Sequence, residues 1–96
     1  MARNNYETIF IADPSLDEEG LNALTEKFKA LIETQGEVSS VENWGKRKLA
    51  YEINYLTEGY YVLINFSAEA DLPAELERVY SITDGIIRSL VVRKDA

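Results

Sequence analysis

The sequence predicts a two-layer α+β sandwich, in which a four-stranded antiparallel sheet carries two helices on one face. Two apolar stripes of helical period alternate with four segments rich in β-branched and aromatic residues. A chain of 96 residues can build one hydrophobic core but not two, so residues 1–96 are expected to form a single domain. The content of 46% hydrophobic and 28% charged residues argues against wholesale disorder.

The first half of the chain predicts a strand followed by a helix. Residues 6–12 form the strand pattern. Ser15 with Glu18 three residues later fits a helix-capping box, although Asp17 could be the N-cap residue instead. Gly36 is the residue expected in a left-handed C-cap. The helix is predicted from apolar residues at helical spacing, namely Leu21, Leu24, Phe28, Leu31 and Ile32.

A long strand pattern covers residues 37–55 and is interrupted near Asn43-Trp44-Gly45. Thr57-Glu58-Gly59 is expected to turn the chain into a hairpin whose second strand covers residues 60–68. Side chains alternate between the faces of a strand, so this second strand divides into two sets. We expect Val62, Ile64 and Phe66 in the core, and Tyr61, Leu63 and Asn65 on the open face.

A second helix is predicted from about Asp71 to Thr83, followed by a last strand over residues 86–93. Pro73 lies in the first turn of this helix, where a missing N–H costs little, and Asp84-Gly85 ends it. Its apolar stripe consists of Leu72, Leu76, Val79 and Tyr80. The order strand, helix, strand, strand, helix, strand is that of a ferredoxin-like fold. Because this fold hosts many functions, function has to be argued from particular residues.

The composition argues against an enzyme. The chain has no histidine and no cysteine, which removes the commonest proton shuttle, the thiol nucleophile and most transition-metal ligands. Asp17, Glu18 and Glu19 crowd a predicted helix start, where acids favour the helix dipole more often than they form a catalytic pair. No catalytic residue, cofactor or metal site is predicted.

Several features predict a cytoplasmic protein. The absence of cysteine excludes a disulfide framework. The first residues lack the apolar core of a signal peptide, and no apolar run approaches the length of a membrane span.

The formal net charge of −7 is unevenly distributed. Residues 13–42 and 65–84, which contain the predicted helices, carry −6 and −4. Residues 43–64 and 85–96, which contain strand patterns, carry +1 and +2. Charges farther apart than about 8 Å are largely screened at physiological salt. The acidic helices therefore do not exclude a polyanion at the strands.

Lys46, Arg47 and Lys48 are three consecutive cations inside a strand pattern. An anionic partner such as a phosphate backbone would relieve their repulsion, but protection of a sheet edge from aggregation explains them equally well. Alternation puts Arg47 on one face and the two lysines on the other, so the three are not expected to contact one run of phosphates. The planar guanidinium of Arg47 suits a bidentate contact, unless it pairs with a helix acid instead.

Aromatic residues give a weaker signal. Residues 58–66 faintly resemble the aromatic third strand of RNA-recognition modules, but Tyr61 makes only a weak stacking platform. Most of the aromatic side chains have a core interpretation, and Trp44 and Tyr61 are the expected exceptions that would anchor a protein partner. The residues given the core interpretation are Tyr6, Trp44, Tyr51, Tyr55 and Tyr60.

The segment from Gly45 to Ile53, with the sequence GKRKLAYEI, closely resembles the signature of the bacterial small-subunit ribosomal protein S-six (S6) family. In that signature a glycine and basic residues precede Leu-Ala-Tyr-x-Ile. Tyr6-Glu7 resembles the opening of the family, Gly59-Tyr60-Tyr61 its third strand, and residues 84–94 its last strand. The similarity covers residues 3–94, with Trp44 standing where the family often has an aliphatic residue.

The resemblance implies a structural component of the small ribosomal subunit with no membrane and no small-molecule substrate. The family binds small-subunit ribosomal RNA in the central domain, or platform, as a heterodimer with the small, basic ribosomal protein S-eighteen (S18). Many relatives carry an extended C-terminal tail, and contacts that depend on such a tail are expected to be absent because this sequence stops at Ala96. The residues expected to contact phosphate or the partner are Arg3, Lys46, Arg47, Lys48, Arg88, Arg93 and Lys94.

Charge also predicts an order of binding. A domain at −7 is repelled from RNA and attracted to a basic protein, so partner binding is expected to precede or be required for tight RNA binding. Two other interpretations stay open on the residues alone: a small-molecule regulatory domain of this topology, and a generic single-stranded RNA-binding module.

Overall fold

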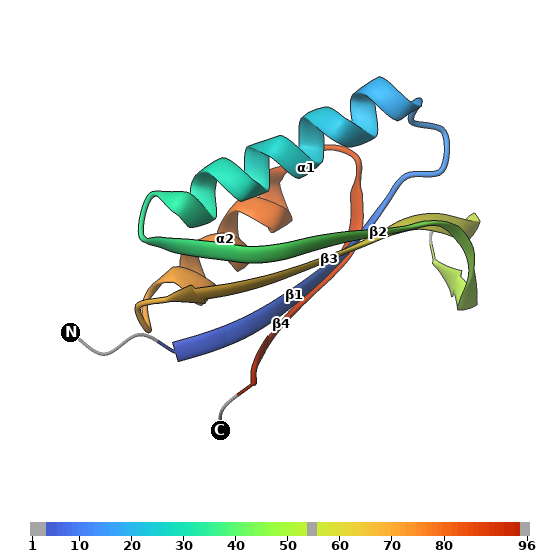
Figure 1. Ribbon diagram of the computed structural model, residues 1–96. Helices are drawn as coiled ribbons and strands as arrows, with labels where there is room; N and C mark the ends of the chain where they lie inside the picture. Colours follow the sequence, from blue (N-terminus) through green and yellow to red (C-terminus); the bar gives the residue numbers. More distant parts are fainter. Residues whose placement is uncertain (1–3, 54–55, 95–96) are drawn as a thin grey trace.

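A four-stranded sheet covered by two helices on one face forms the body of the molecule (Figure 1). The computed structural model describes residues 4–53 and 56–94, and the side chains of these residues apart from 50–53 and 56. The elements in order are β1 (Asn4–Ala12), α1 (Glu18–Glu33), β2 (Gly36–Ile53), β3 (Leu56–Ala68), α2 (Leu72–Ile82) and β4 (Ile86–Arg93). This order confirms the predicted ferredoxin-like fold.

The strands lie in the order β2-β3-β1-β4, and every neighbouring pair is antiparallel. The edges of the sheet are therefore β2 and β4. Both helices pack on the same face, so the opposite face is left without a covering layer (Figure 1). Among residues 4–53 and 56–94, no helix is both long enough and apolar enough to cross a membrane.

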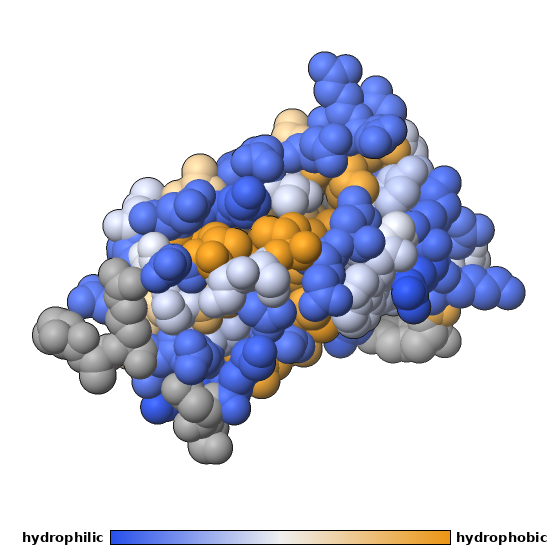
Figure 2. Space-filling model, in the orientation of Figure 1, coloured by the Kyte–Doolittle hydropathy of each residue, from blue (hydrophilic) through white to orange (hydrophobic). Residues whose placement is uncertain are grey.

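The core lies between the sheet and the helices, and both predicted helical stripes face it. Phe10, Phe28 and Tyr80 form an aromatic cluster with ring centroids 4.3 to 5.8 Å apart. The predicted side of β3 is confirmed, because Val62, Ile64 and Phe66 belong to the core cluster, whereas Leu63 is buried but lies outside that cluster. Figure 2 shows apolar side chains in the seam between α1 and β2, below the hydrophilic outer surface of α1.

Thr8 is the one buried polar residue among those described, and its hydroxyl is fully satisfied. Thr8 Oγ1 donates to the carbonyl oxygen of Leu90 at 3.0 Å and lies 3.0 Å from Tyr80 Oη. A hydroxyl has a single proton, so Tyr80 Oη is the donor to Thr8. Burial raises the pKa of Tyr80 well above its usual range.

Asp17, and not Ser15, caps α1. The Asp17 carboxylate accepts a hydrogen bond from the Gly20 amide at 2.7 Å. The backbone amide and the hydroxyl of Ser15 instead both donate to Asp13 Oδ1 at 2.8 Å, and these bonds lower the pKa of Asp13. The capping-box prediction was therefore wrong, and its Asp17 alternative is confirmed.

The role predicted for Gly36 was also wrong. The helix ends at Glu33, its C-cap residue Thr34 has right-handed backbone angles, and Gly36 is the first residue of β2. A Cβ atom on Gly36 would lie 2.2 Å from the carbonyl oxygen of Ser67. Glycine is needed there because β3 passes so close, and not because of a left-handed backbone.

The predicted hairpin turn is displaced along the chain. Thr57-Glu58-Gly59 lies inside β3, where Glu58 is paired with Lys48 and Gly59 with Arg47. β2 ends at Ile53 and β3 begins at Leu56, and residues 54–55 lie outside the described residues. The turn-like composition of Thr57-Glu58-Gly59 was misleading here, because pairing with β2 holds Glu58 and Gly59 in a strand.

Because β2 and β3 are longer than β1, their paired ends extend past the rest of the sheet (Figure 1). The last residue of β1, Ala12, pairs with Tyr60, so residues 56–59 have no partner on β1. We call the part of the hairpin from Arg47 to Gly59 the overhang. It carries Arg47 and Lys48, two of the three consecutive cations identified in the sequence.

Candidate nucleic-acid and protein interface

The open face of the sheet carries a band of apolar side chains. Ile9 lies opposite Leu63 on β3 and opposite Leu90 on β4, which makes one row across three strands. Leu90 is 57% exposed and Val92 is 44% exposed. We call Ile9, Leu63, Leu90 and Val92 the apolar band. Large apolar side chains gathered on an uncovered face indicate a contact surface.

Sequence reasoning placed Leu63 on this face but missed Leu90 and Val92. The signal was present in the last strand, which is apolar on both of its faces. Val91 lies opposite the buried Thr8 and therefore faces the helices. Alternation then assigns the two residues beside Val91 to the open face.

Two carboxylates lie beside the apolar band. Glu42 on β2 is opposite Leu63, and Glu7 on β1 is opposite Asn65 and Val92. These positions are on the open face by the same alternation. A surface that combines apolar side chains with acids favours a partner that brings apolar groups and positive charge.

Trp44 and Tyr61 form an aromatic pair at the hairpin end of the open face. Their ring centroids are 6.4 Å apart and the ring planes are inclined by 13°. Trp44 is 39% exposed, Tyr61 is half-buried, and neither belongs to the core. The core interpretation of Trp44 was therefore wrong, and among the described aromatic residues Trp44 and Tyr61 are exceptions, as expected. Tyr6 is buried and Tyr60 packs against the core, whereas the side chains of Tyr51 and Tyr55 lie outside the described residues.

A β-bulge puts Trp44 in this position. Asn43 pairs with Val62 and Gly45 with Tyr61, so Trp44 has no partner of its own on β3. Gly45 adopts a φ of 77°, which favours glycine, and its amide donates to Asn43 Oδ1 at 2.8 Å. The interruption predicted near residues 43–45 is confirmed as this bulge.

Arg47 lies against Trp44. Its Nε donates to the Trp44 carbonyl oxygen at 3.3 Å, and its Cζ lies 5.3 Å from the centroid of the indole ring. No carboxylate in the described part of the chain pairs with it, and the ion pairs found there join neighbours within α1 and within α2. The alternative that Arg47 pairs with a helix acid was therefore wrong.

Lys46 and Lys48 lie on the other face from Arg47, as alternation predicted. Their register partners on β3 are Tyr60 and Glu58, and the ammonium of Lys46 lies 5.4 Å from the Tyr60 ring centroid. Both lysines are exposed. The three consecutive cations therefore present positive charge on both sides of the hairpin.

The remaining predicted cations lie on or after β4. Arg88 is exposed on the open face opposite Ile11, at the far edge of the sheet from β2. Three strand spacings, or about 14 Å, separate the backbones of the two edges, so Arg88 and Arg47 lie at opposite sides of the sheet. Arg93 lies on the helix side opposite Tyr6, where its guanidinium donates to Asn4 Oδ1 at 2.9 Å. Arg3 lies outside the described residues.

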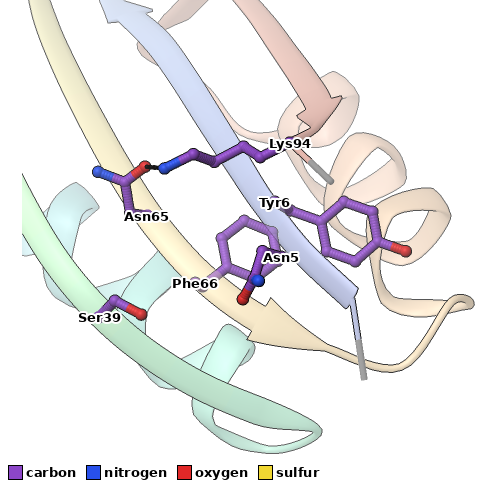
Figure 3. A pocket seen from close by; sticks show the side chains of 6 residues that line it. All are labelled: Asn5, Tyr6, Ser39, Asn65, Phe66 and Lys94. Carbon is purple, nitrogen blue, oxygen red and sulfur yellow. Dashed lines mark hydrogen bonds between the residues drawn. The ribbon is translucent and has the colours of Figure 1, made fainter. Parts of the chain in front are cut away.

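Lys94 lies at the other end of the open face from the aromatic pair. Its Nζ donates to Asn65 Oδ1 at 2.9 Å, and Figure 3 shows its side chain reaching across β1 to that amide. Asn65 in turn donates to Ser40 Oγ at 3.0 Å. The side chains border a hollow of about 240 Å³ lined by Asn5, Tyr6, Ser39, Asn65, Phe66 and Lys94.

The basic residues therefore form no single patch. Those that the structure describes lie in the β2–β3 hairpin, on the edge strand β4 and at Lys94, and the middle of the open face between them is apolar and acidic. In residues 4–53 and 56–94 no three acidic, histidine or cysteine side chains are grouped as a metal site would require. The described residues therefore define a ferredoxin-like domain whose open face is apolar and acidic and whose cations lie at separate positions.

Comparison with known proteins makes the assignment specific. The family model for ribosomal protein S6 matches residues 5–93. The small ribosomal subunit protein bS6 of Clostridium perfringens is 62% identical over 91 residues, which is 94% of this chain and 96% of that protein. The bS6 protein of Clostridium novyi is 59% identical over 92 residues, covering 95% and 97% of the two chains.

A solved structure agrees with the fold. The crystal structure of the 30S ribosomal protein S6 from Thermotoga maritima superimposes with a TM-score of 0.91 at 38% identity, covering 97% of this chain and 89% of that one. The chain belongs to the bacterial ribosomal protein S6 family. It is a structural component of the small ribosomal subunit and not an enzyme.

Proposed function

We propose that this protein binds small-subunit ribosomal RNA in the platform, as a heterodimer with the basic ribosomal protein S18. Membership of the S6 family supports this assignment. The observation that carries it is the uncovered sheet face, with apolar and acidic groups at its centre and basic groups around it. Such a division of surfaces suits a protein that contacts a basic protein and a polyanion together.

The open face is the proposed S18 surface. Its apolar band supplies contact area, and Trp44 and Tyr61 supply aromatic side chains of the type that dominates binding energy at interfaces. Glu7 and Glu42 lie within the same face and complement a cationic partner. The regulatory-domain alternative would instead bind a ligand at a sheet edge between two copies of the chain, and it predicts a homodimer and a ligand-induced thermal shift.

The proposed RNA contacts are the cations around the apolar band. Lys46, Arg47 and Lys48 occupy the hairpin, and Arg88, Arg93 and Lys94 occupy the last strand and the residue after it; Arg3 is proposed with them. Their role is positional: they neutralise phosphates and release counterions, and the RNA is then recognised through its shape. We expect few base contacts, because Tyr61 is stacked against Trp44.

The net charge of −7 sets the order of assembly. Long-range repulsion lowers the RNA affinity of the isolated chain, and a basic partner adds positive charge that offsets this repulsion. S18 binding is therefore proposed to precede tight RNA binding or to be required for it.

The test is the affinity for a central-domain ribosomal RNA fragment, measured with and without S18 over a salt series. We expect weak binding without S18, and a strong dependence on salt with it. Reversing the charges of Lys46, Arg47 and Lys48 should lower the affinity and reduce the slope of log K against log salt by about two to three units. Nanomolar binding by the isolated chain at physiological salt would contradict the assembly order.

One substitution distinguishes our proposal from the alternative of a generic single-stranded RNA-binding module. If bases stack on the sheet, Tyr61→Ala should abolish RNA binding even when S18 is saturating. Under our proposal this variant loses S18 affinity and keeps most of its RNA affinity once S18 is bound.

A further inference from the structure

We propose that Trp44 is a positioning residue that presents the Arg47 guanidinium, already oriented, to one phosphate group of RNA. This inference rests on the proposed RNA-binding function and adds a specific device to it. It goes beyond the assignment of Trp44 as a protein anchor, because it gives the indole a role toward a residue of its own chain.

Trp44 holds Arg47 by two different contacts. The backbone carbonyl accepts from Arg47 Nε at 3.3 Å, and the indole ring lies 5.3 Å from Cζ. The first contact fixes one edge of the guanidinium, and the second fixes its distance from the ring. Together they select one orientation of a side chain that is exposed and would otherwise sample many.

Trp44 is itself held in place by three strand positions. Its ring stacks on Tyr61 of β3 at 6.4 Å, and its Nε1 donates to Glu42 Oε1 at 3.5 Å. The left-handed backbone of Gly45 follows directly, stabilised by the bond from its amide to Asn43 Oδ1. The orientation of Arg47 is therefore set by the sheet, through the bulge and the indole ring.

The guanidinium retains the donors that a phosphate needs. Of its five N–H groups only the one on Nε has a protein acceptor in the described residues, which leaves the two terminal nitrogens for a ligand. Two parallel N–H groups match two oxygens of one phosphate. Lys46 and Lys48 on the adjoining positions add positive charge, which favours a phosphate backbone over an isolated carboxylate.

A double-mutant cycle at saturating S18 tests this inference. Trp44→Leu should weaken binding to the central-domain RNA fragment about three- to ten-fold, because Arg47 must then be ordered on binding. The same substitution in an Arg47→Ala background should have no further effect. Trp44→Phe keeps an aromatic ring and the carbonyl, so it should retain most of the affinity.

Two further readouts separate positioning from a general loss of structure. The slope of log K against log salt should be unchanged in Trp44→Leu, which keeps every charge, and should fall by about 0.7 to 0.9 in Arg47→Ala. In the free protein, the NMR signal of the Arg47 Nε–H should be protected from solvent exchange and should lose that protection in Trp44→Leu. The melting temperature should stay the same, since Trp44 lies outside the core.

Each contrary outcome has a definite meaning. If Trp44→Leu is equally damaging with and without Arg47, then Trp44 acts on S18 or on the RNA directly, and the inference is wrong. If Arg47→Ala weakens S18 binding and not RNA binding, the ligand is a carboxylate of the partner protein, and the inference is also wrong. If no charge reversal in the hairpin affects RNA binding, the proposed function itself fails.

Discussion

A single hydroxyl pair ties three elements of the core together. Tyr80 on α2 donates to Thr8 on β1, and Thr8 donates to the carbonyl oxygen of Leu90 on β4. Both side chains are buried, so their polar atoms have no access to water as an alternative partner. The pair therefore fixes how α2 sits across the junction of β1 and β4.

Replacing Tyr80 with phenylalanine should lower the free energy of unfolding by about 1 kcal/mol at neutral pH, because one buried hydrogen bond is lost while ring packing is kept. Urea denaturation measures this change. Tyr61→Phe is the matched control on the open face and should change stability by less than about 0.5 kcal/mol. Equal losses for the two variants would contradict the role given to the buried hydroxyl.

The same tyrosine should make the free energy of unfolding depend on pH in the alkaline range. Burial raises the pKa of Tyr80 in the folded state above its unfolded value of about 10. The folded state then holds the phenolic proton more tightly than the unfolded state does. The resulting stabilisation is fully present below pH 10 and is lost as pH rises toward the folded pKa, by up to about 1.4 kcal/mol per pH unit. Denaturation should be measured at a series of pH values above 10. The free energy of unfolding should fall less steeply with pH for Tyr80→Phe than for the wild-type chain.

At the scale of elements, the two helices begin differently. Asp17 at the start of α1 accepts a hydrogen bond from Gly20, whereas Asp71 at the start of α2 has right-handed backbone angles and makes no such bond. Asp17→Ala should therefore destabilise the protein by about 1 kcal/mol, and Asp71→Ala by clearly less. Thermal or urea unfolding of the two variants checks the difference, and a larger loss at Asp71 would contradict it.

The elements themselves could largely be predicted from sequence. The helical stripes and the last strand, residues 86–93, follow from hydrophobic period alone, because one-sided burial imposes that period. The misplaced features were Gly36 and the turn at Thr57-Glu58-Gly59. Both depend on how closely one strand approaches another, and local composition does not contain that information.

The candidate site was less predictable for the same reason. Alternation placed the Arg47 side chain on the opposite face from Lys46 and Lys48, and it placed Tyr61 on the open face. It did not decide between a core position and an exposed position for Trp44. The contact between Trp44 and Arg47 could not be predicted, because it depends on the bulge at Gly45. A bulge moves one side chain relative to its neighbours without leaving a periodic signal.

At the scale of the whole molecule, exposed apolar residues distinguish the two faces. Leu90 lies on the open face, and Ile82, which is 68% exposed, lies at the end of α2 in the helical layer. Leu90→Asp should weaken S18 binding about tenfold or more, because it puts a charge into the apolar band. Ile82→Asp is the matched control and should leave S18 binding unchanged. Calorimetric titration of S18 checks both variants, and equal affinities would remove the open face from the proposed interface.

The overhang of the hairpin has a consequence for how the molecule responds to heat. The molecule is 43 Å long, and beyond Ala12 the two long strands pair only with each other. A two-stranded ribbon is marginally stable in water, so its backbone amides can open while the core stays closed. Hydrogen exchange at Lys48 should therefore be faster than at Phe10 and insensitive to substitutions in the core. If Arg47 holds a phosphate as proposed, warming should weaken RNA binding before the domain itself melts.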